Sequence, residues 1–452
     1  MRGKVAFFLI ILALLAGVLF HTTDNRGPES IRCTEGCNVI IIVVDTLAAG
    51  HLRTYGYDRD TMPRTEQFFS SGTIFENAYS GAPWTLPSFA SLYFSNVPSQ
   101  VTFKDLARNG KPSFVSAARD AGSTIYGVLL PNTVFVTDAV NSPFMEEEIE
   151  YGGTDTFSKA EGAVRRLLEQ SKRTDNQFLL MVHTFDAHDP YSPLPPYDSA
   201  FGTSERNKTV TMQDILRANQ AATPTMETLH DYTLRYDQQL LRLDDKLGKF
   251  LESIPESALD DTVVILMSDH GEAFWEHGHF WHGLSLHKEE MHVPFMVRAP
   301  GTDVLRVTEP ISLLDLGPTV LSVMGISSPE TFVGDDISPL LTGGSLGKRL
   351  LRYENGYPFS LHTITPDIVP PSSLAAVGAW DTNLPVIEKS SEGARWSNLV
   401  YMRAVRVPSK SFMFDLSSDP AEKKSLLATT TARTHAPLVK QFKEMLHAEG
   451  LF

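Results

Sequence analysis

The chain has 452 residues, with 39 Lys and Arg against 54 Asp and Glu, which gives a formal net charge of −15. This acidic balance argues against nucleic-acid binding, because a nucleic-acid site needs a basic face. The hydrophobic fraction of 42% can bury a large core and therefore excludes wholesale disorder. The length predicts two or three domains, or one large α/β domain with an appendage.

The N-terminus carries an uncharged apolar run, Val5–Phe20, preceded by Arg2 and Lys4. A signal peptide has an apolar core of about 7–15 residues and a small-residue cleavage site, and no Ala-x-Ala site follows here. A membrane-spanning helix needs about 20 apolar residues. We interpret residues 1–23 as an uncleaved signal anchor, with a cleaved signal as the alternative. The basic start predicts a membrane-anchored protein whose catalytic part lies outside the cytoplasm, on the periplasmic or extracellular side.

Residues 24–37 are polar and predict a tether. They contain both cysteines of the chain, in the pentapeptide Cys33–Cys37. In an oxidising compartment these two can form a short disulfide loop. Two free thiols are the alternative.

Five apolar runs follow and predict buried strands, at 38–44, 123–130, 178–185, 262–269 and 293–300. Helical periodicity lies between them, as at 160–170 and 231–251. Buried strands that alternate with helices indicate an α/β fold with a mostly parallel central sheet flanked by helices. We expect this domain to span residues 38–345.

After about residue 345 the segments become shorter and more polar, and several prolines appear. Residues 411–420 predict an edge strand and a turn, and residues 436–449 predict a terminal helix. We therefore expect residues 346–452 to form a small C-terminal α+β subdomain.

Charged and imidazole side chains follow three of the predicted strands. In open α/β sheets, ligands collect at the carboxyl ends of strands. Carboxylates and imidazoles at one sheet edge suit a divalent cation, although an Asp after a strand can instead cap a helix. The candidate ligands are Asp45, then His183, Asp186 and His188, and then Asp269 and His270. Asp269 and His270 are adjacent in sequence, and Gly271 allows the sharp turn that two adjacent ligands need. A histidine-rich loop with His277, His279 and His282 comes next, for which a solvated loop is the alternative.

Five blocks of the sequence resemble the sulfatase branch of the alkaline phosphatase superfamily, in family order. They are Asp45–Leu92, the segment HTFDAHDPY at 183–191, Ser268–Gly301, Ser312–Ile326 and Phe414–Leu427. The resemblance covers roughly residues 38–430. It implies the alkaline phosphatase/sulfatase-like fold and a metal-dependent ester hydrolase or transferase.

The resemblance also implies roles for particular residues. A divalent cation, which could be Ca, Mg, Mn or Zn, is expected on Asp45, Asp269, His270 and the nucleophile. His188 and His282 fall where the family contacts the ester oxygens or the leaving group, so either is a candidate general acid. Alternatively they hold a second metal with Asp186. His183 and His277 are further candidates for substrate or second-metal contacts.

The nucleophile motif departs from the family pattern. Where sulfatases have Cys or Ser, followed by x-Pro-x-Arg, this chain reads Thr85-Leu86-Pro87-Ser88-Phe89. Threonine cannot be oxidised to the formylglycine aldehyde, the motif's Arg is Phe89, and the family's Gly-Lys-Trp-His segment is missing. Thr85 can still attack as an alkoxide, because a metal-bound hydroxyl loses its proton readily. Capping a helix is the structural alternative for Thr85.

These departures favour phosphate esters and diesters as substrates of a Thr85 nucleophile. The alternatives are a sulfuric ester hydrolase without formylglycine and a non-catalytic binding ectodomain of the same fold. The expected partners are a small-molecule, glycan or lipid ester substrate and the membrane at the N-terminal helix, with no nucleic acid.

Overall fold

The computed structural model describes residues 36–101, 110–131, 140–144, 147–203, 209–220, 224–346 and 350–355. It also describes three later strands and the isolated positions 31, 33, 105, 419 and 421–423. The predicted anchor at 1–23 and the predicted terminal helix at 436–449 lie outside these residues. Within the described part of the chain, no helix combines the length and the apolar character needed to cross a membrane.

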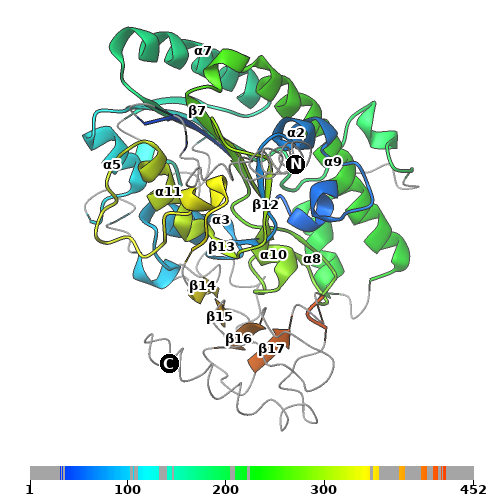
Figure 1. Cartoon of the computed structure of the whole chain (residues 1–452). Helices are drawn as coiled ribbons and strands as arrows, with labels where there is room; N and C mark the ends of the chain where they lie inside the picture. The colour runs from blue at the N-terminus through cyan, green and yellow to red at the C-terminus, as the bar shows by residue number, and fades with distance from the viewer. Residues whose placement is uncertain are drawn as a thin grey trace, which may run out of the picture.

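An eight-stranded sheet forms the centre of the main domain (Figure 1). The strands β7, β1, β6, β4 and β5 run parallel, whereas β11 is antiparallel to both of its neighbours. The predicted mostly parallel α/β sheet is therefore confirmed. In spatial order the strands are β12 (Leu305–Val307), β2 (Thr73–Phe75), β11 (Phe295–Arg298), β7 (Thr262–Met267), β1 (Asn38–Val44), β6 (Phe178–Thr184), β4 (Thr124–Leu129) and β5 (Glu148–Tyr151).

Helices cover both faces of this sheet (Figure 1). The long helices α7 (Thr156–Thr174) and α9 (Met226–Ser253) lie on one face. On the other face lie α3 (Thr85–Phe94), α5 (Phe114–Asp120) and α11 (Leu316–Val323). The described residues also form the α-helices α2 (Pro63–Phe69), α8 (Met212–Gln220) and α10 (Lys288–Met291).

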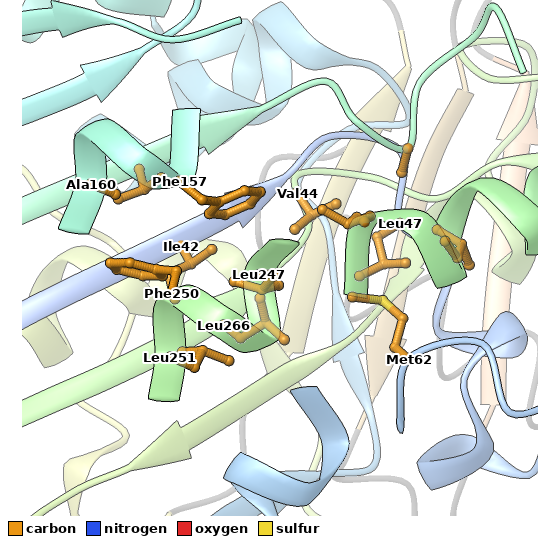
Figure 2. Close-up of a cluster of buried hydrophobic side chains, with 14 of the residues drawn as sticks. Ile42, Val44, Leu47, Met62, Phe157, Ala160, Leu247, Phe250, Leu251 and Leu266 are labelled. Atoms are coloured by element: carbon orange, nitrogen blue, oxygen red, sulfur yellow. The ribbon is translucent and has the colours of Figure 1, made fainter. Parts of the chain in front are cut away.

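The central strand β1 is apolar at every position after Asn38, and its packing shows why. Successive side chains of a strand point to opposite faces. Ile40, Ile42 and Val44 pack into the core beneath α7 and α9, whereas Val39, Ile41 and Val43 pack into the core beneath α3, α5 and α11. Figure 2 shows the first core, where Ile42 and Val44 meet side chains from both long helices. A strand buried on both faces holds its carboxyl end rigidly, and the candidate site begins at that end.

Smaller sheets complete the structure. One joins β10 (His292–Val293), β3 (Ala78–Tyr79) and β13 (Ile311–Ser312), and a hairpin joins β8 (Ala273–Phe274) to β9 (Phe280–Trp281). A separate antiparallel sheet contains β14 (Leu350–Asn355), β15 (Ala376–Asp381), β16 (Leu399–Ala404) and β17 (Ser411–Asp415). The strand β17 is at the edge of this sheet, as predicted for 411–420. The domain boundary at 345/346 stays a prediction.

The two cysteines form a disulfide, Cys33–Cys37, directly before β1. The sequence left open a disulfide loop or two free thiols, and the structure has the disulfide. The backbone N–H of Cys37 also donates to the carbonyl of Val323, which ties the start of β1 to the end of α11.

His292 in β10 predicts a pH dependence of folding. Its Nε2 lies 2.8 Å from the Glu76 carbonyl, its ring packs between Tyr55 and Tyr79, and burial lowers its pKa to about 4. The unfolded chain has an ordinary histidine pKa of about 6.5 and takes up a proton first as the pH falls. The stability that depends on neutral His292 is therefore present above about pH 6.5 and is lost towards pH 4. We expect His292→Gln to reduce the acid-induced loss of unfolding free energy by about 3 kcal/mol, measured by denaturant unfolding at both pH values. Equal losses in the two proteins would contradict this.

Candidate active site

Three predicted ligands meet at the carboxyl ends of the two adjacent parallel strands β1 and β7. Asp45 directly follows β1, and Asp269 and His270 follow β7. All three side chains are fully buried. One donor atom from each lies within 4.8 Å of the others, so the three side chains can share a single ion.

Thr85 completes this group from the first turn of α3. Its Oγ1 lies 3.4 Å from Asp45 Oδ2 and 3.4 Å from His270 Nε2. Trp84, not Thr85, occupies the cap position of α3, so the interpretation of Thr85 as a helix cap is wrong. The N-terminus of a helix carries partial positive charge, which favours an anionic oxygen at this point.

Side-chain hydroxyls hold the Asp269 segment against α3. Ser80 and Ser88 both donate to the backbone carbonyl of Asp269 at 2.6 Å. Ser268 accepts the backbone N–H of Leu47 at 2.9 Å, which connects the β7 end to the β1 end. Neither Ser80 nor Ser268 was singled out from the sequence. These bonds fix the relative positions of the three segments that contribute donor atoms.

Backbone strain accompanies the site. Thr46, directly after Asp45, has φ 61°, a conformation that is costly for a β-branched residue and is often found at functional sites. Its carbonyl accepts the buried Tyr236 hydroxyl at 2.7 Å, which holds the strained turn in place. The turn directs the peptide N–H of Thr46 towards Asp269 Oδ1, at 3.4 Å.

The ring of His270 is oriented for coordination. Its Nδ1 lies 2.9 Å from the Gly271 carbonyl and donates to it, which leaves the Nε2 lone pair facing Thr85. Gly271 itself is needed for space rather than for the predicted sharp turn. A Cβ on Gly271 would lie 2.1 Å from the Glu289 carbonyl oxygen.

The electrostatics of this group fit a cation. Asp45 Oδ1 and Asp269 Oδ2 are buried oxygens without a hydrogen-bond partner in the described structure. Burial and the charge of Asp45 raise the pKa of Asp269 well above its usual range. Burial also raises the pKa of Asp45, but the neighbouring His183, His188 and His270 outweigh it and the net pKa is lowered. Because two buried carboxylates side by side are costly without a counter-charge, the residues present fit a divalent metal ion.

Two further predicted histidines line the same site. The ring of His282 lies 4.5 Å from that of His270 and 5.1 Å from that of His188, measured between centroids. Burial, together with the charge of His188, lowers the pKa of His282 to about 4. Burial lowers the pKa of His188 as well, but the carboxylates of Asp45 and Asp189 outweigh it and raise the net pKa. The pKa values of the two rings are therefore shifted in opposite directions.

Two acidic residues that the sequence analysis did not single out support these histidines. Both carboxylate oxygens of the buried Glu272 lie 3.3 Å from His282 Nδ1. The Asp189 carbonyl lies 2.8 Å from His188 Nδ1, and its carboxylate accepts the Trp281 indole N–H at 3.1 Å. Glu272 stands three positions after Asp269 in the same turn, which was the one signal available in the sequence.

His183 belongs to the site, whereas Asp186 and His277 are engaged elsewhere. His183 Nε2 lies 3.5 Å from Asp45 Oδ2, and its ring packs against Phe89, the residue that replaces the motif's Arg. Asp186 accepts from Lys246 at 2.6 Å and from Thr184 at 2.9 Å. These bonds use both carboxylate oxygens, so the structure gives no support to a second metal on Asp186, His188 and His282. His277 contacts Glu289 and Glu422.

The contact between Glu272 and His282 predicts that a substitution of Glu272 lowers kcat. Glu272→Gln keeps the side-chain shape but replaces one carboxyl oxygen with an amide N–H, which weakens the contact that orients the His282 ring. We expect kcat to fall by about 10–100-fold, as is typical for residues that orient a functional histidine. Steady-state kinetics measures this, with Glu276→Gln in the same loop as control. A KM effect without a kcat effect would contradict the positioning role.

Comparison with known proteins decides the family. The family model "Sulfatase" matches residues 37–326. The chain belongs to the sulfatase family. Among the relatives, human "Arylsulfatase K" is 22% identical over 91% of this chain and 82% of its own length. "Delta 4,5-hexuronate-2-O-sulfatase" of Bacteroides thetaiotaomicron is 21% identical over 87% of this chain and 85% of its own length.

Solved structures share the sulfatase fold. A protein solved in complex with its substrate D-glucosamine-2-N,6-O-disulfate superposes with a TM-score of 0.67 at 15% identity, covering 91% of this chain and 98% of that chain. The phosphonate monoester hydrolase of Agrobacterium radiobacter has a TM-score of 0.66 at 15% identity, covering 91% and 95%. The predicted fold and family are thus confirmed, and the chain is a sulfatase-family ester hydrolase.

Proposed function

We propose that this sulfatase-family hydrolase cleaves a sulfuric ester, with unmodified Thr85 as the nucleophile and a divalent cation on Asp45, Asp269 and His270. The single observation that carries the proposal is the position of the Thr85 hydroxyl, which lies 3.4 Å from both a metal-site carboxylate and a metal-site imidazole. The hydroxyl is not the cap of α3, because Trp84 occupies that position.

The cation, when bound, supplies positive charge that favours the Thr85 alkoxide and neutralises the ester anion. The Thr85 oxygen attacks the sulfur, the S–O bond to the alcohol breaks, and the sulfuryl group is transferred to Thr85. Water then cleaves the sulfuryl-threonine and releases sulfate. The helix N-terminus at Thr85 stabilises negative charge in both steps.

The leaving alcohol needs a proton, and His188 is placed to give it. Its side chain is 20% exposed, in contrast to the buried His282, so it borders the solvent side of the site. The Asp189 carbonyl occupies its Nδ1, which leaves Nε2 for the substrate oxygen. His282, held by Glu272, then accepts a proton from the attacking water in the second step.

Sulfur is favoured by the two relatives described above, both of which are named as sulfatases, and by the structural neighbour solved with a disulfated glucosamine. A sulfated glycan is therefore the substrate class that we propose. Phosphate esters form the second candidate, favoured by Thr85 itself, because a phosphoryl-threonine turns over by ordinary in-line displacement. A phosphonate monoester hydrolase is among the structural neighbours.

One experiment separates the two candidates. Purified protein is assayed in parallel on matched aryl esters of sulfate, phosphate, phosphodiester and phosphonate, with metal analysis of the same sample. We expect the highest kcat/KM for the sulfate ester and loss of every activity in Thr85→Ala. Faster turnover of a phosphorus ester would favour the second candidate. Full activity of Thr85→Ala would contradict both candidates, because both use Thr85 as the nucleophile.

We further propose that the catalytic domain works outside the cytoplasm, on the periplasmic or extracellular side. The Cys33–Cys37 disulfide supports this location, because such bonds persist in oxidising compartments. N-terminal sequencing of the protein from fractionated cells tests the anchor at the same time. An intact N-terminus in the membrane fraction is the expected result, and a start between residues 17 and 30 would contradict the anchor.

A further inference from the structure

Trp281 connects the two chain segments that carry His188 and His282. It directly precedes His282, and the centroids of the two rings lie 4.8 Å apart. Its indole N–H donates to Asp189 Oδ1 at 3.1 Å, across 92 residues of sequence. Asp189 directly follows His188. Trp281 thus contacts one histidine directly and the other through a carboxylate, yet the proposed reaction gives it no role.

Two oxygens of Asp189 surround one nitrogen of the His188 ring. The Nδ1 atom of His188 lies 2.8 Å from the Asp189 backbone carbonyl oxygen and 3.3 Å from carboxylate Oδ1. Both oxygens accept hydrogen bonds, so Nδ1 carries a hydrogen whether the ring is neutral or charged. The nitrogen that gives or takes a proton is therefore Nε2. Its direction is set by the place where Asp189 holds Nδ1.

The Asp189 carboxylate depends on Trp281 for its own position. The Asp189 side chain is only 7% exposed, so water can do little to support its charge. Oδ1 accepts the Trp281 indole N–H, and no other side chain of the described residues donates to this carboxylate. A buried carboxylate that loses a donor pays its desolvation cost and turns towards another one. Removing the indole N–H should therefore move the carboxylate away from His188 Nδ1.

The backbone aims the Trp281 ring through a strained conformation. Its φ of 84° is unusual for a bulky residue. On one side, Asn219 of α8 accepts the Phe280 N–H at 2.7 Å and donates to the Phe280 carbonyl at 3.0 Å. On the other side, the Gly283 N–H donates to the Pro83 carbonyl at 2.8 Å. Strain that neighbouring contacts hold in place is often found at functional sites.

We propose that Trp281 is a positioning residue for the proton transfer to the leaving alcohol. Its indole N–H keeps the Asp189 carboxylate beside His188 Nδ1, and the two Asp189 oxygens direct Nε2 towards the oxygen of the breaking ester bond. This inference rests on the proposed function, in which His188 is the general acid. As the S–O bond breaks, the leaving oxygen takes the proton from Nε2, and the ring is left neutral with its hydrogen on Nδ1. The effect of Trp281 should therefore grow with the leaving group's need for a proton.

Two aryl esters of similar size test this dependence. Nitrophenol leaves readily as an anion, whereas methoxyphenol needs a proton. Their sulfate esters, or their phosphorus esters if the wild type prefers these, are assayed with metal-loaded, full-length protein. The readout is kcat/KM, because it covers the steps up to departure of the alcohol and not the later hydrolysis.

Trp281→Phe keeps an aromatic ring against His282 and removes only the N–H that reaches Asp189. We expect kcat/KM to fall by about 10–100-fold for the methoxyphenyl ester and to change little for the nitrophenyl ester. Trp275→Phe is the matched control. Trp275 lies in the same hairpin with φ 79°, and its ring packs on Phe280. This control should leave both values unchanged.

His188→Gln separates failure of this inference from failure of the proposed function. It should show a steeper dependence on the leaving group than Trp281→Phe, and combining the two should cost nothing further, because both act through one proton. A steep dependence in His188→Gln with equal losses for both esters in Trp281→Phe would overturn the inference alone and make Trp281 a packing residue. No dependence in His188→Gln would overturn the assignment of His188 as the acid, and the inference with it.

Asp189→Ala replaces Trp281→Phe if that variant fails to fold. It removes the carboxylate that the indole N–H holds and keeps the backbone carbonyl at His188 Nδ1. The same selective loss for the methoxyphenyl ester is expected. Equal losses for both esters would again count against the inference.

Discussion

Thr85→Ala should reduce kcat by roughly 10³–10⁶-fold, the range seen when an enzyme loses its nucleophile. Alanine removes the one hydroxyl that lies 3.4 Å from both Asp45 and His270. The change should leave the fold intact, because the Thr85 hydroxyl is not the cap of α3 and alanine is a good helix former. Steady-state kinetics on the best ester, with circular dichroism and metal analysis of the same sample, measures this.

Thr85→Ser is the matched control for this prediction. Serine keeps the oxygen but loses the methyl group that restricts its rotamer, so part of the activity should remain. Retention of more than about a tenth of wild-type kcat by Thr85→Ala would show that water bound at the site does the chemistry without the threonine. Failure of Thr85→Ala to bind metal while remaining folded would instead make Thr85 an essential ligand.

Asp269→Asn should abolish metal binding and activity, with a loss in kcat on the order of 10³-fold or more. It should also make the metal-free protein more stable than metal-free wild type. Asp269 Oδ2 is buried without a partner, and burial beside Asp45 raises the pKa of Asp269. An amide keeps the 2.9 Å bond from the His270 N–H to Oδ1 but carries no charge. Removing the ion thus leaves wild type with a repulsion that the variant lacks.

Thermal unfolding with and without chelator tests this pair of effects. Wild type should lose stability when the metal is removed, and Asp269→Asn should show no response at the catalytic site. Asp261→Asn, just before β7, is the control for a general effect of removing an acidic residue. An Asp269→Asn protein that is less stable than metal-free wild type would mean that the carboxylate has a structural role instead.

The sequence was most informative about the strands of the sheet. The run Asn38–Val44 is apolar at every position after Asn38 because both of its faces are buried, and its boundaries in the structure are those predicted. The run at 293–300 was predicted as one strand, but Pro294 cannot donate to a ladder and separates β10 from β11. Its antiparallel direction depends on pairing with β7 and β2, which no local pattern encodes.

The candidate site was predictable where its residues follow strands. Asp45 and Asp269 could be placed together because the carboxyl ends of parallel strands meet at one sheet edge. Asp186 has the same kind of position, yet it pairs with Lys246 from α9, a contact that only the packing of that helix determines. The contact between Trp281 and Asp189 likewise depends on tertiary structure across 92 residues.

In the proposed reaction an unmodified Thr85 attacks the ester. Mass spectrometry of the peptide that contains Thr85 tests this most directly, before substrate is added and after a rapid acid quench during turnover. We predict an unmodified threonine before reaction and a sulfuryl group on Thr85, or a phosphoryl group with a phosphorus ester, in the quenched sample. Turnover without any adduct on Thr85, in a protein where His282→Ala has slowed the second step, would contradict it.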